Sequence, residues 1–371
     1  MESDKKINVA IVGLEGDFKE DIGEGIQLYI YEIYKNLQKF DDINVTKKEY
    51  KVLFGSFGYA IKKLMRTLSF GLSFIFDSFK NIDIVHNITT MPTFKPRLLR
   101  KYILITTIHD FNAKLDFRKF GIEDKQRFKE RLRGSFVMLI IKLNLKFTDY
   151  VIAISEQTKN ECIDLGFSKN KIYVVNSALR SIFKSELLKK KKDNNIFKVG
   201  YIGAFTKRKN VSFAVEACMK VKGRDFEFLF YGKENQEQMK LKEIARSDSR
   251  IKFMGFAPED QLIKIYDSFD VFVFPSVYEG FGLEPLEAQA RGIPVVIYKN
   301  SMIPNEVRKY CLEAESPEHM AQIIEDLKKN GYNEKLRKEA MNYARSFTWD
   351  NTISKIVDVY KDLLKRKENK I

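Results

Sequence analysis

The chain has 371 residues and a formal net charge of +15. At about 150 residues per domain, this length predicts two domains, or three. Hydrophobic residues make up 44% and charged residues 31%, proportions that are typical of folded proteins and exclude wholesale disorder. No apolar run approaches the ~18 residues that a membrane-spanning helix needs.

Strands and helices alternate in the prediction for the first half of the chain. Residues 7–12 form a short apolar strand, which a glycine-containing loop follows. An amphipathic helix comes next, because apolar residues recur at spacings of four, three and four: Ile26, Ile30, Ile33 and Leu37. Further strands are predicted at 82–85, 102–108, 150–154 and 172–175. These runs lack polar alternation, which favours parallel sheets covered on both faces.

A charged segment without apolar pattern interrupts this alternation and is predicted to be a linker, residues 185–196. Strands then resume at 197–202, 226–231, 251–254, 270–274 and 294–298. Beyond about residue 317 the pattern is helical, and Trp349 begins a last helix. The sequence therefore predicts an α/β protein of two doubly wound domains, at 1–184 and 197–347, followed by a C-terminal helix at 348–371.

The loops after the strands are the candidates for chemistry, because open parallel sheets bind ligands at the carboxyl ends of their strands. The segment 275–288 follows one strand and carries Glu279 and Glu287, eight residues apart, with glycines between them. We expect the amides of Phe281, Gly282 and Leu283 to point out of a helix start that binds an anion, with Pro285 at the first helical position. Glu287 can accept hydrogen bonds from a vicinal diol such as a ribose. The alternative is a purely structural loop.

A second loop, 203–210, follows the strand at 197–202 and contains Arg208 and Lys209. We expect these cations to neutralise a diphosphate leaving group through charge-assisted hydrogen bonds. The alternative is a solvated basic turn.

Two of the 3 histidines stand at strand ends of the first domain, His86 and His109. We expect His109 to contact a sugar hydroxyl or the transferred group, and we leave His86 open between a functional and a structural role. Gly25, at the start of the first helix, would let the backbone approach a phosphate.

The positive charge is uneven. Residues 61–146 hold 18 Lys and Arg against 7 Asp and Glu, a balance of +11. Such a field attracts polyanions, which include nucleic acid, anionic lipid and phosphorylated substrates. Basic and apolar residues interleave at 61–66 and 125–133, which predicts contact with an anionic membrane surface. Two helices with solvated outer faces are the alternative.

Taken together, these motifs resemble glycosyltransferase family 4, the group 1 retaining glycosyltransferases of GT-B fold. The likeness is most specific at Glu279–Glu287. Supporting segments are 25–30, 107–110, 151–156, 208–210 and 291–296. The resemblance implies two Rossmann-like domains facing a central cleft, with the last helix crossing back to the first domain. It also implies that the second domain binds a nucleotide-sugar donor and the first domain receives the acceptor.

The resemblance also implies roles for individual residues. Glu287 would be the ribose ligand and Glu279 the donor-sugar ligand, with Arg208 and Lys209 as the diphosphate clamp. His109 would contact the donor sugar from the first domain, and Ser276 would border the base and phosphates.

No Asp-x-Asp motif occurs, so we expect neither a catalytic metal nor another cofactor. The absence of a convincing carboxylate nucleophile favours same-face transfer with retention. The sequence thus predicts a retaining enzyme that moves a hexose to a glycan or lipid-linked acceptor. A nucleic-acid-binding protein, or a non-catalytic nucleotide-sugar-binding protein of the same fold, remains as the alternative, although no nucleic acid is expected as a partner.

The expected location is the cytoplasm, with peripheral contact at the inner face of the cell membrane. The N-terminus lacks the apolar core of a secretory signal. The three cysteines are odd in number and far apart, which fits a reducing compartment: Cys162, Cys218 and Cys311.

Overall fold

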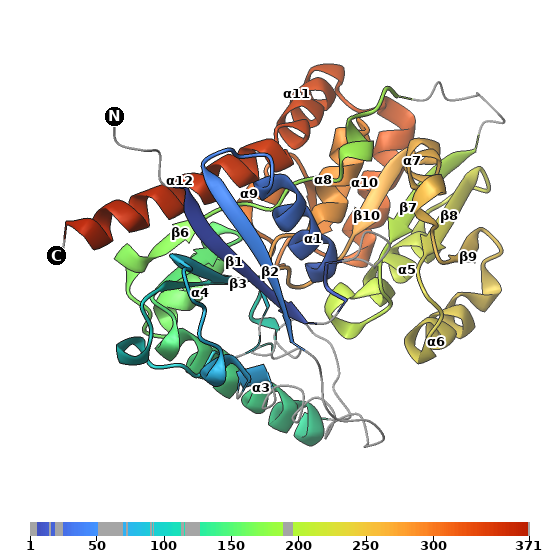
Figure 1. Ribbon diagram of the computed structural model, residues 1–371. Helices are drawn as coiled ribbons and strands as arrows, with labels where there is room; N and C mark the ends of the chain where they lie inside the picture. The colour runs from blue at the N-terminus through green and yellow to red at the C-terminus, as the bar shows by residue number, and fades with distance from the viewer. Residues whose placement is uncertain are drawn as a thin grey trace. The chain divides into compact units, whose positions relative to one another are not determined.

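The computed structural model describes residues 6–14, 16–18, 25–50, 70–71, 73–89, 91, 93–112, 115, 127–187 and 196–369, without the side chains of 127–133. The chain divides into two compact units. The first comprises Met1–Lys114, Gln126–Ser177 and Trp349–Ile371, and the second comprises Leu115–Lys125 and Ala178–Thr348. Each unit is an α/β domain with its own sheet (Figure 1).

The first unit is built on a six-stranded sheet in the order β2-β1-β3-β4-β5-β6, in which every neighbouring pair is parallel. Its strands are β1 (Ile7–Leu14), β2 (Ile43–Tyr50), β3 (Ile84–Asn87), β4 (Ile103–Ile108), β5 (Tyr150–Ala153) and β6 (Ile172–Val174). The central strands are buried on both faces, as their uniform apolar runs predict.

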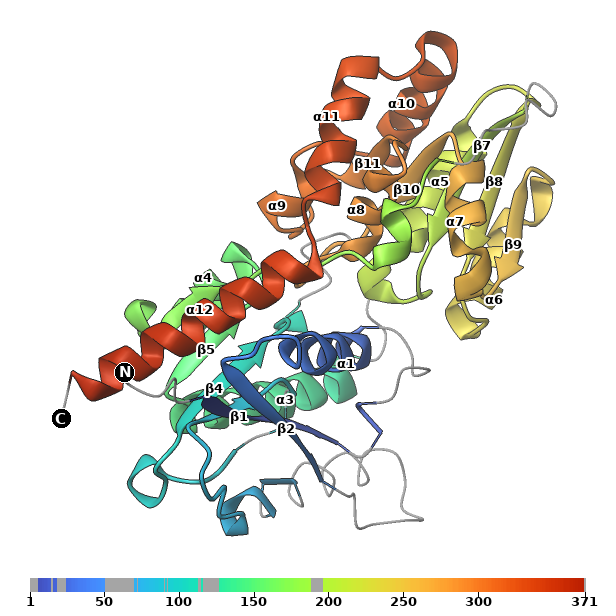
Figure 2. The ribbon, with the colours of Figure 1, turned by 45° about the horizontal axis from the view of Figure 1, so that its top comes forward.

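Helices cover the first sheet: α1 (Ile26–Leu37), α3 (Arg127–Phe147) and α4 (Glu156–Asp164), with short 3₁₀ turns at Arg97–Leu99 and Lys169–Lys171. The expected stripe of α1 is buried at Ile30, Ile33 and Leu37, while Ile26 is partly exposed. The last helix, α12 (Trp349–Glu368), belongs to this unit and packs against α1, as predicted (Figure 2).

The second unit has a six-stranded sheet, also parallel throughout, in the order β12-β11-β10-β7-β8-β9. Its strands are β7 (Phe197–Ile202), β8 (Phe226–Tyr231), β9 (Ile251–Gly255), β10 (Val271–Phe274), β11 (Val295–Tyr298) and β12 (Leu312–Ala314). Taken in chain order these strands run 3-2-1-4-5-6 across the sheet, the arrangement of a dinucleotide-binding Rossmann domain.

Helices also cover the second sheet. They are α5 (Val211–Lys220), α6 (Gln236–Ile244), α7 (Glu259–Ser268), α8 (Leu283–Ala290), α9 (Asn305–Arg308), α10 (Pro317–Asn330) and α11 (Glu334–Arg345), with 3₁₀ turns at Ser181–Lys184, Lys207–Lys209 and Ala245–Ser247. Both units are therefore doubly wound α/β domains, as the sequence predicts.

The boundary between the units lies at Ser177, whereas the expected first domain extends to residue 184. Residues 178–184 join the second unit because their side chains pack there: Phe183 meets the Tyr266 ring at 5.2 Å, and Arg180 pairs with Glu287. Most of the expected linker, residues 188–195, lies outside the described residues.

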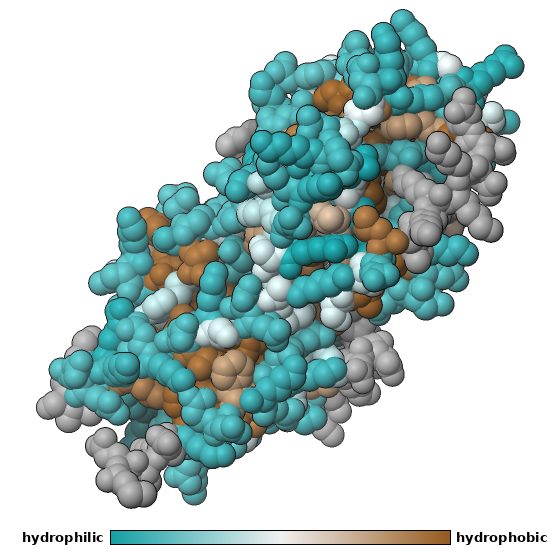
Figure 3. Space-filling model, turned by 90° about the horizontal axis from the view of Figure 1, so that it is seen from above, coloured by the Kyte–Doolittle hydropathy of each residue, from teal (hydrophilic) through white to brown (hydrophobic). Residues whose placement is uncertain are grey.

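The surface of the described residues is mixed in character. Figure 3 shows a face on which hydrophilic side chains predominate and hydrophobic ones gather in separate patches. Among the helices that the structure describes, none combines the length and the apolar composition needed to span a bilayer.

Candidate functional site

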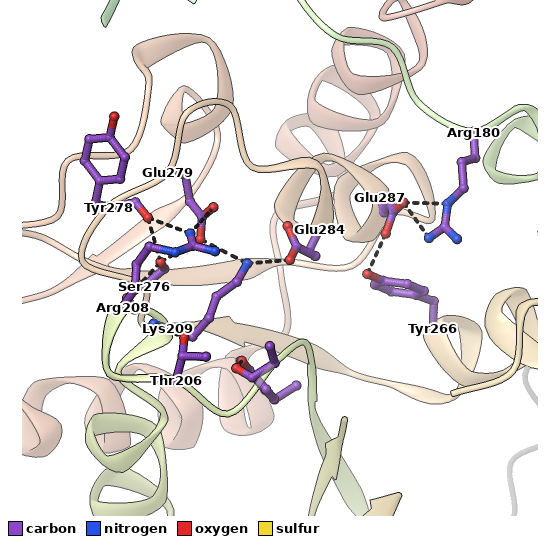
Figure 4. Close-up of polar contacts among 12 residues, drawn as sticks. Arg180, Thr206, Arg208, Lys209, Tyr266, Ser276, Tyr278, Glu279, Glu284 and Glu287 are labelled. Carbon is purple, nitrogen blue, oxygen red and sulfur yellow. Dashed lines mark hydrogen bonds and ion pairs between the residues drawn. The ribbon is translucent and has the colours of Figure 1, made fainter. Parts of the chain in front are cut away.

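The winding of the second sheet reverses between β10 and β7, which are hydrogen-bonded neighbours. Loops that leave two such strands diverge at their carboxyl ends and open the crevice in which ligands of this fold class bind. The loop after β7 carries Arg208 and Lys209, and the loop after β10 carries Ser276 and Glu279. Four expected site residues from two distant segments therefore meet at the switch point (Figure 4).

Local hydrogen bonds fix the loop after β7. The Thr206 hydroxyl accepts a hydrogen bond from the Lys209 amide at 3.4 Å and caps a 3₁₀ turn. Asn210 ends that turn with a left-handed φ of 49°, a conformation that asparagine tolerates better than most residues. The carbonyl of Arg208 accepts from the Val277 amide at 2.9 Å and so joins the two loops.

The carboxylate of Glu279 is the centre of the cluster. It lies 2.5 Å from Arg208 Nη1 and 3.0 Å from Lys209 Nζ, and it accepts a hydrogen bond from the Ser276 hydroxyl at 2.6 Å. Burial raises the pKa of Glu279, but Lys209 and Arg208 outweigh that effect and hold it below its usual range. Glu279 is therefore ionised and held in place by three hydrogen-bond donors.

Lys209 is itself buried, with 6% of its side chain exposed, and its ammonium lies 4.6 Å from the centre of the Phe274 ring. Burial lowers the pKa of Lys209, but Glu279 and Glu284 raise it above its usual value. The ammonium thus stays charged inside the protein because two carboxylates face it.

Helix α8 begins directly after Gly282, without a side-chain cap. Gly282 caps the helix with a φ of 94°, and a Cβ at this position would stand 3.4 Å from the Glu279 side chain. Phe281 is buried against Phe347, and Leu283 is the first helical residue. Pro285 was predicted at the first helical position, but it is the third helical residue, because α8 begins at Leu283 directly after the glycine cap.

Glu287 lies one turn further along α8 and has different partners. One carboxylate oxygen receives hydrogen bonds from Arg180 Nε at 3.0 Å and Nη2 at 2.7 Å, and the other receives one from the Tyr266 hydroxyl at 2.9 Å. Burial raises the pKa of Glu287 above its usual value although Arg180 opposes the shift.

The other two expected site residues, His109 and Gly25, belong to the first unit. His109 follows β4, and its Nε2 donates to the Ile88 carbonyl at 3.0 Å, so Nδ1 is the acceptor nitrogen. The ring meets Tyr29 edge-on at 5.0 Å, and burial lowers the pKa of His109 to about 4. Gly25 caps α1 with a φ of 76°, which an L-residue rarely adopts.

The contacts of His86 indicate a structural role. Its Nδ1 lies 2.7 Å from the Tyr360 hydroxyl of α12 and its Nε2 lies 2.7 Å from the Thr107 hydroxyl of β4. The side chain is fully buried, and burial lowers its pKa to about 3. A neutral His86 therefore ties α12 to the sheet.

The sequence interpretation missed three side chains of this site: Arg180, Tyr266 and Glu284. Arg180 lies 107 residues from Glu287 in the chain, and no local pattern links the two. Glu284 stands within the segment 275–288, but an acidic residue in a first helical turn is also expected from the helix dipole alone.

Two family models match the chain. The model of Glycosyltransferase Family 4 matches residues 24–179, and the model of Glycosyl transferases group 1 matches residues 182–347. Each match falls mainly on one α/β unit, and the second contains Arg208, Lys209, Ser276, Glu279 and Glu287.

Individual relatives agree with the models. O-antigen chain mannosyltransferase B of Escherichia coli is 29% identical over 170 residues, which are 43% of this chain and 45% of that protein. The match thus spans less than half the length of this curated relative. The structure of sucrose-phosphate synthase from Thermosynechococcus elongatus aligns with a TM-score of 0.76 at 16% identity and covers 97% of this chain and 100% of that one.

The Anabaena protein HepE, solved in complex with UDP and glucose, aligns with a TM-score of 0.67 at 15% identity and covers 96% of this chain and 99% of that one. At identities of 15% and 16%, these structures support only the fold, a two-domain α/β fold of the GT-B class. The family is shown by the two family models, which match consecutive parts of the chain from residue 24 to residue 347. The chain belongs to the glycosyltransferases of family 4 and group 1.

Proposed function

We propose that this protein is a retaining glycosyltransferase that moves a hexose from a nucleoside-diphosphate sugar to a glycan or lipid-linked acceptor, without a catalytic metal. The observation that carries the proposal is the convergence of Arg208, Lys209 and Glu279 at the switch point of the second sheet. Two cations beside a helix start suit a diphosphate, and a fixed carboxylate suits the hydroxyls of a sugar.

In this proposal the donor lies across the loops after β7 and β10. The diphosphate meets Arg208, Lys209 and the amides of 281–283 at the start of α8. Glu279 accepts hydrogen bonds from hydroxyls of the hexose. Glu287 accepts from the ribose, and Arg180 and Tyr266 hold its carboxylate in position.

In the reaction, the bond between the anomeric carbon and the diphosphate oxygen breaks, and the sugar passes through an oxocarbenium-like state. The negative charge that develops on the diphosphate is stabilised by Arg208 and Lys209. The acceptor hydroxyl oxygen bonds to the anomeric carbon on the same face, and its proton moves to the departing phosphate oxygen. The neutral His109 accepts a hydrogen bond from a sugar hydroxyl through Nδ1.

The test is release of nucleoside diphosphate from a panel of UDP-, GDP- and ADP-hexoses, with and without EDTA. We expect release with at least one donor, unchanged by EDTA, and a product whose anomeric configuration in NMR spectra equals that of the donor. Loss of activity in EDTA that Mg²⁺ restores contradicts the metal-free mechanism. Donor binding without any release supports the non-catalytic alternative instead.

The double variant Arg208→Ala, Lys209→Ala tests the diphosphate clamp. We expect kcat to fall more than donor affinity, because charge accumulates on the diphosphate only as the bond breaks. Steady-state kinetics and calorimetry on the same preparation separate the two effects. Near-wild-type turnover of the double variant would show that other groups stabilise the leaving group.

We further propose that the enzyme works at the cytoplasmic face of a membrane. The basic side chains of the expected segments 61–66 and 125–133 lie outside the described residues. Support comes from exposed apolar side chains within the same basic stretch of the sequence, 61–146: Phe76 at 84%, Leu98 at 98% and Leu99 at 66%. Lys95 joins the stretch around Phe76 to the stretch around Leu98 through a 2.6 Å hydrogen bond to the Asp77 carbonyl. The exposed Arg97 and Lys101 add positive charge there.

Flotation with liposomes tests this location. We expect binding to vesicles that contain anionic lipid, a decrease at high salt, and a further decrease in a variant with Leu98 and Leu99 replaced by Ser. Neutralising Lys125, Arg127, Lys129, Arg131 and Arg133 should weaken binding as well. Absence of binding at low salt would indicate a soluble acceptor.

A further inference from the structure

The ammonium of Lys209 is shared between two carboxylates. Its Nζ lies 3.0 Å from Glu279 Oε1 and 2.5 Å from Glu284 Oε1 (Figure 4). With Arg208 included, the cluster contains two positive and two negative side chains and is close to neutral as it stands. A neutral cluster lacks the excess positive charge that attracts a diphosphate.

The two carboxylates are held differently. Glu279 receives hydrogen bonds or ion pairs from Arg208, Lys209 and Ser276, and only 8% of its side chain is exposed. Glu284 pairs with Lys209 alone among the described residues, and 25% of its side chain is exposed. The carboxylate of Glu284 is therefore the one that can leave Lys209 and turn to solvent.

The position of Glu284 is also the position at which an anion would compete. It is the second residue of α8, inside the first turn, where the helix dipole favours negative charge. A diphosphate bound at this helix start would meet the same dipole and the same ammonium. Glu284 and a bound diphosphate thus draw on the same two sources of stabilisation.

We propose that Glu284 is an internal counter-ion. Its carboxylate pairs with Lys209 while the donor site is empty, and the diphosphate of the donor displaces it from Lys209 on binding. This inference rests on the proposed function and adds a residue that sets donor affinity. Displacement uses part of the binding free energy of the diphosphate, so Glu284 weakens ground-state binding of the donor and of the released nucleoside diphosphate. A low affinity for the released nucleoside diphosphate favours its departure after each turnover.

The proposal makes a graded prediction for ligands that differ only in phosphate charge. The variant Glu284→Gln keeps the shape of the side chain and removes its charge. We expect its affinity for a nucleoside diphosphate to rise by roughly three- to tenfold, because a repulsive charge near the phosphates is lost. The gain should be smaller for the monophosphate and absent for the nucleoside. A merely structural role would lower all three affinities together.

Calorimetry measures this series with uridine, UMP and UDP, and with the guanosine and adenosine series in parallel. Glu284→Ala is a second variant in case the glutamine distorts the turn, and circular dichroism checks that each variant is folded. Glu313→Gln is the matched control, because Glu313 forms an ion pair with Arg308 at 2.8 Å in the same unit and its hydrogen bonds go to Arg308 and to none of the cluster side chains. The control should bind every ligand as the wild type does.

Two failures are distinguishable. If the wild type binds a nucleoside diphosphate and neither Glu284 variant binds it more tightly, the counter-ion role is wrong and the proposed function stands. If the wild type binds no UDP, GDP or ADP, the proposed function and this inference both fall.

Discussion

Two carboxylates eight residues apart, Glu279 and Glu287, acquire opposite electrostatic properties from their surroundings. Both are buried, and burial raises the pKa of each. Lys209 and Arg208 reverse the shift at Glu279, whereas Arg180 only reduces it at Glu287. Paired carboxyl groups with diverging pKa values are typical of functional sites, since each is adjusted to a separate contact.

A substitution at Glu287 should separate ligand binding from structural support. Glu287→Gln keeps the shape of the side chain but removes the charge that Arg180 and Tyr266 stabilise. We expect nucleoside diphosphate affinity to fall by about 1.5–3 kcal/mol, the usual contribution of a hydrogen bond to a charged group. Calorimetry measures the affinity, and urea unfolding measures the stability.

Glu259→Gln is the matched control for this experiment. Glu259 contacts the same arginine at 3.6 Å, but 71% of its side chain is exposed. Exposed ion pairs contribute little, so this variant should bind nucleotide almost normally. Unchanged nucleotide affinity in Glu287→Gln would remove Glu287 from the donor site.

At the scale of single residues, the sequence predicted which loops carry the candidate residues but not the contacts among them. Arg208, Lys209 and Glu279 were expected on strand-end loops, and the structure brings those loops together because β7 and β10 are neighbours. The partners of Glu287 were not predictable, because Arg180 and Tyr266 approach it only through tertiary packing. The structural role of His86 likewise depends on Tyr360, 274 residues away.

At the scale of elements, the sequence predicted every described strand except β2 and β12, each of which lies at one edge of its sheet. The expected ranges 197–202 and 226–231 coincide with β7 and β8, whose apolar runs are continuous. The first sheet ends in β2, which is polar and largely exposed, and the second ends in β12, which has only three residues. These two strands lack the continuous apolar run by which the others were recognised, whereas β6 and β9 at the opposite edges were predicted.

The docking of α12 on the first unit offers a test at this scale. The Tyr360 hydroxyl lies 2.7 Å from His86 Nδ1 in a fully buried position. Tyr360→Phe leaves that nitrogen without a partner, which should cost about 1–3 kcal/mol of unfolding free energy. Trp349 is the single tryptophan of the chain and lies at the start of α12 against Tyr29. Its fluorescence therefore reports the unfolding of this unit.

Tyr173→Phe is the control for the α12 experiment. The Tyr173 hydroxyl donates to Asp362 of the same helix at 2.5 Å, but this contact is partly exposed. Its loss should cost less than the loss of the buried contact, because water can replace the missing partner. Equal effects of the two variants would mean that the His86 contact does not secure α12.

At the scale of the whole molecule, two buried neutral histidines make stability depend on pH. The pKa is about 3 for His86 and about 4 for His109, against a usual value of 6.5. Below pH 6.5 the unfolded chain therefore binds protons that the folded chain does not, so stability is fully present above that pH and falls as the pH decreases toward 4. The raised pKa of Glu287 acts in the opposite direction, since its contribution is present at low pH and is lost as the pH rises.

The contribution of one histidine can be isolated by comparing slopes. Each histidine accounts for up to about 1.4 kcal/mol of unfolding free energy per pH unit between the two pKa values. We expect urea unfolding, followed by Trp349 fluorescence between pH 5 and 7, to show a decrease in stability at the acid end. His86→Asn should flatten this dependence whatever it does to stability at pH 7, because asparagine has no proton to gain. If the unfolding free energy of the variant and of the wild type changes equally with pH, His86 takes up a proton in the folded state as readily as in the unfolded state. A protonated His86 would then have to fit between the hydroxyls of Tyr360 and Thr107.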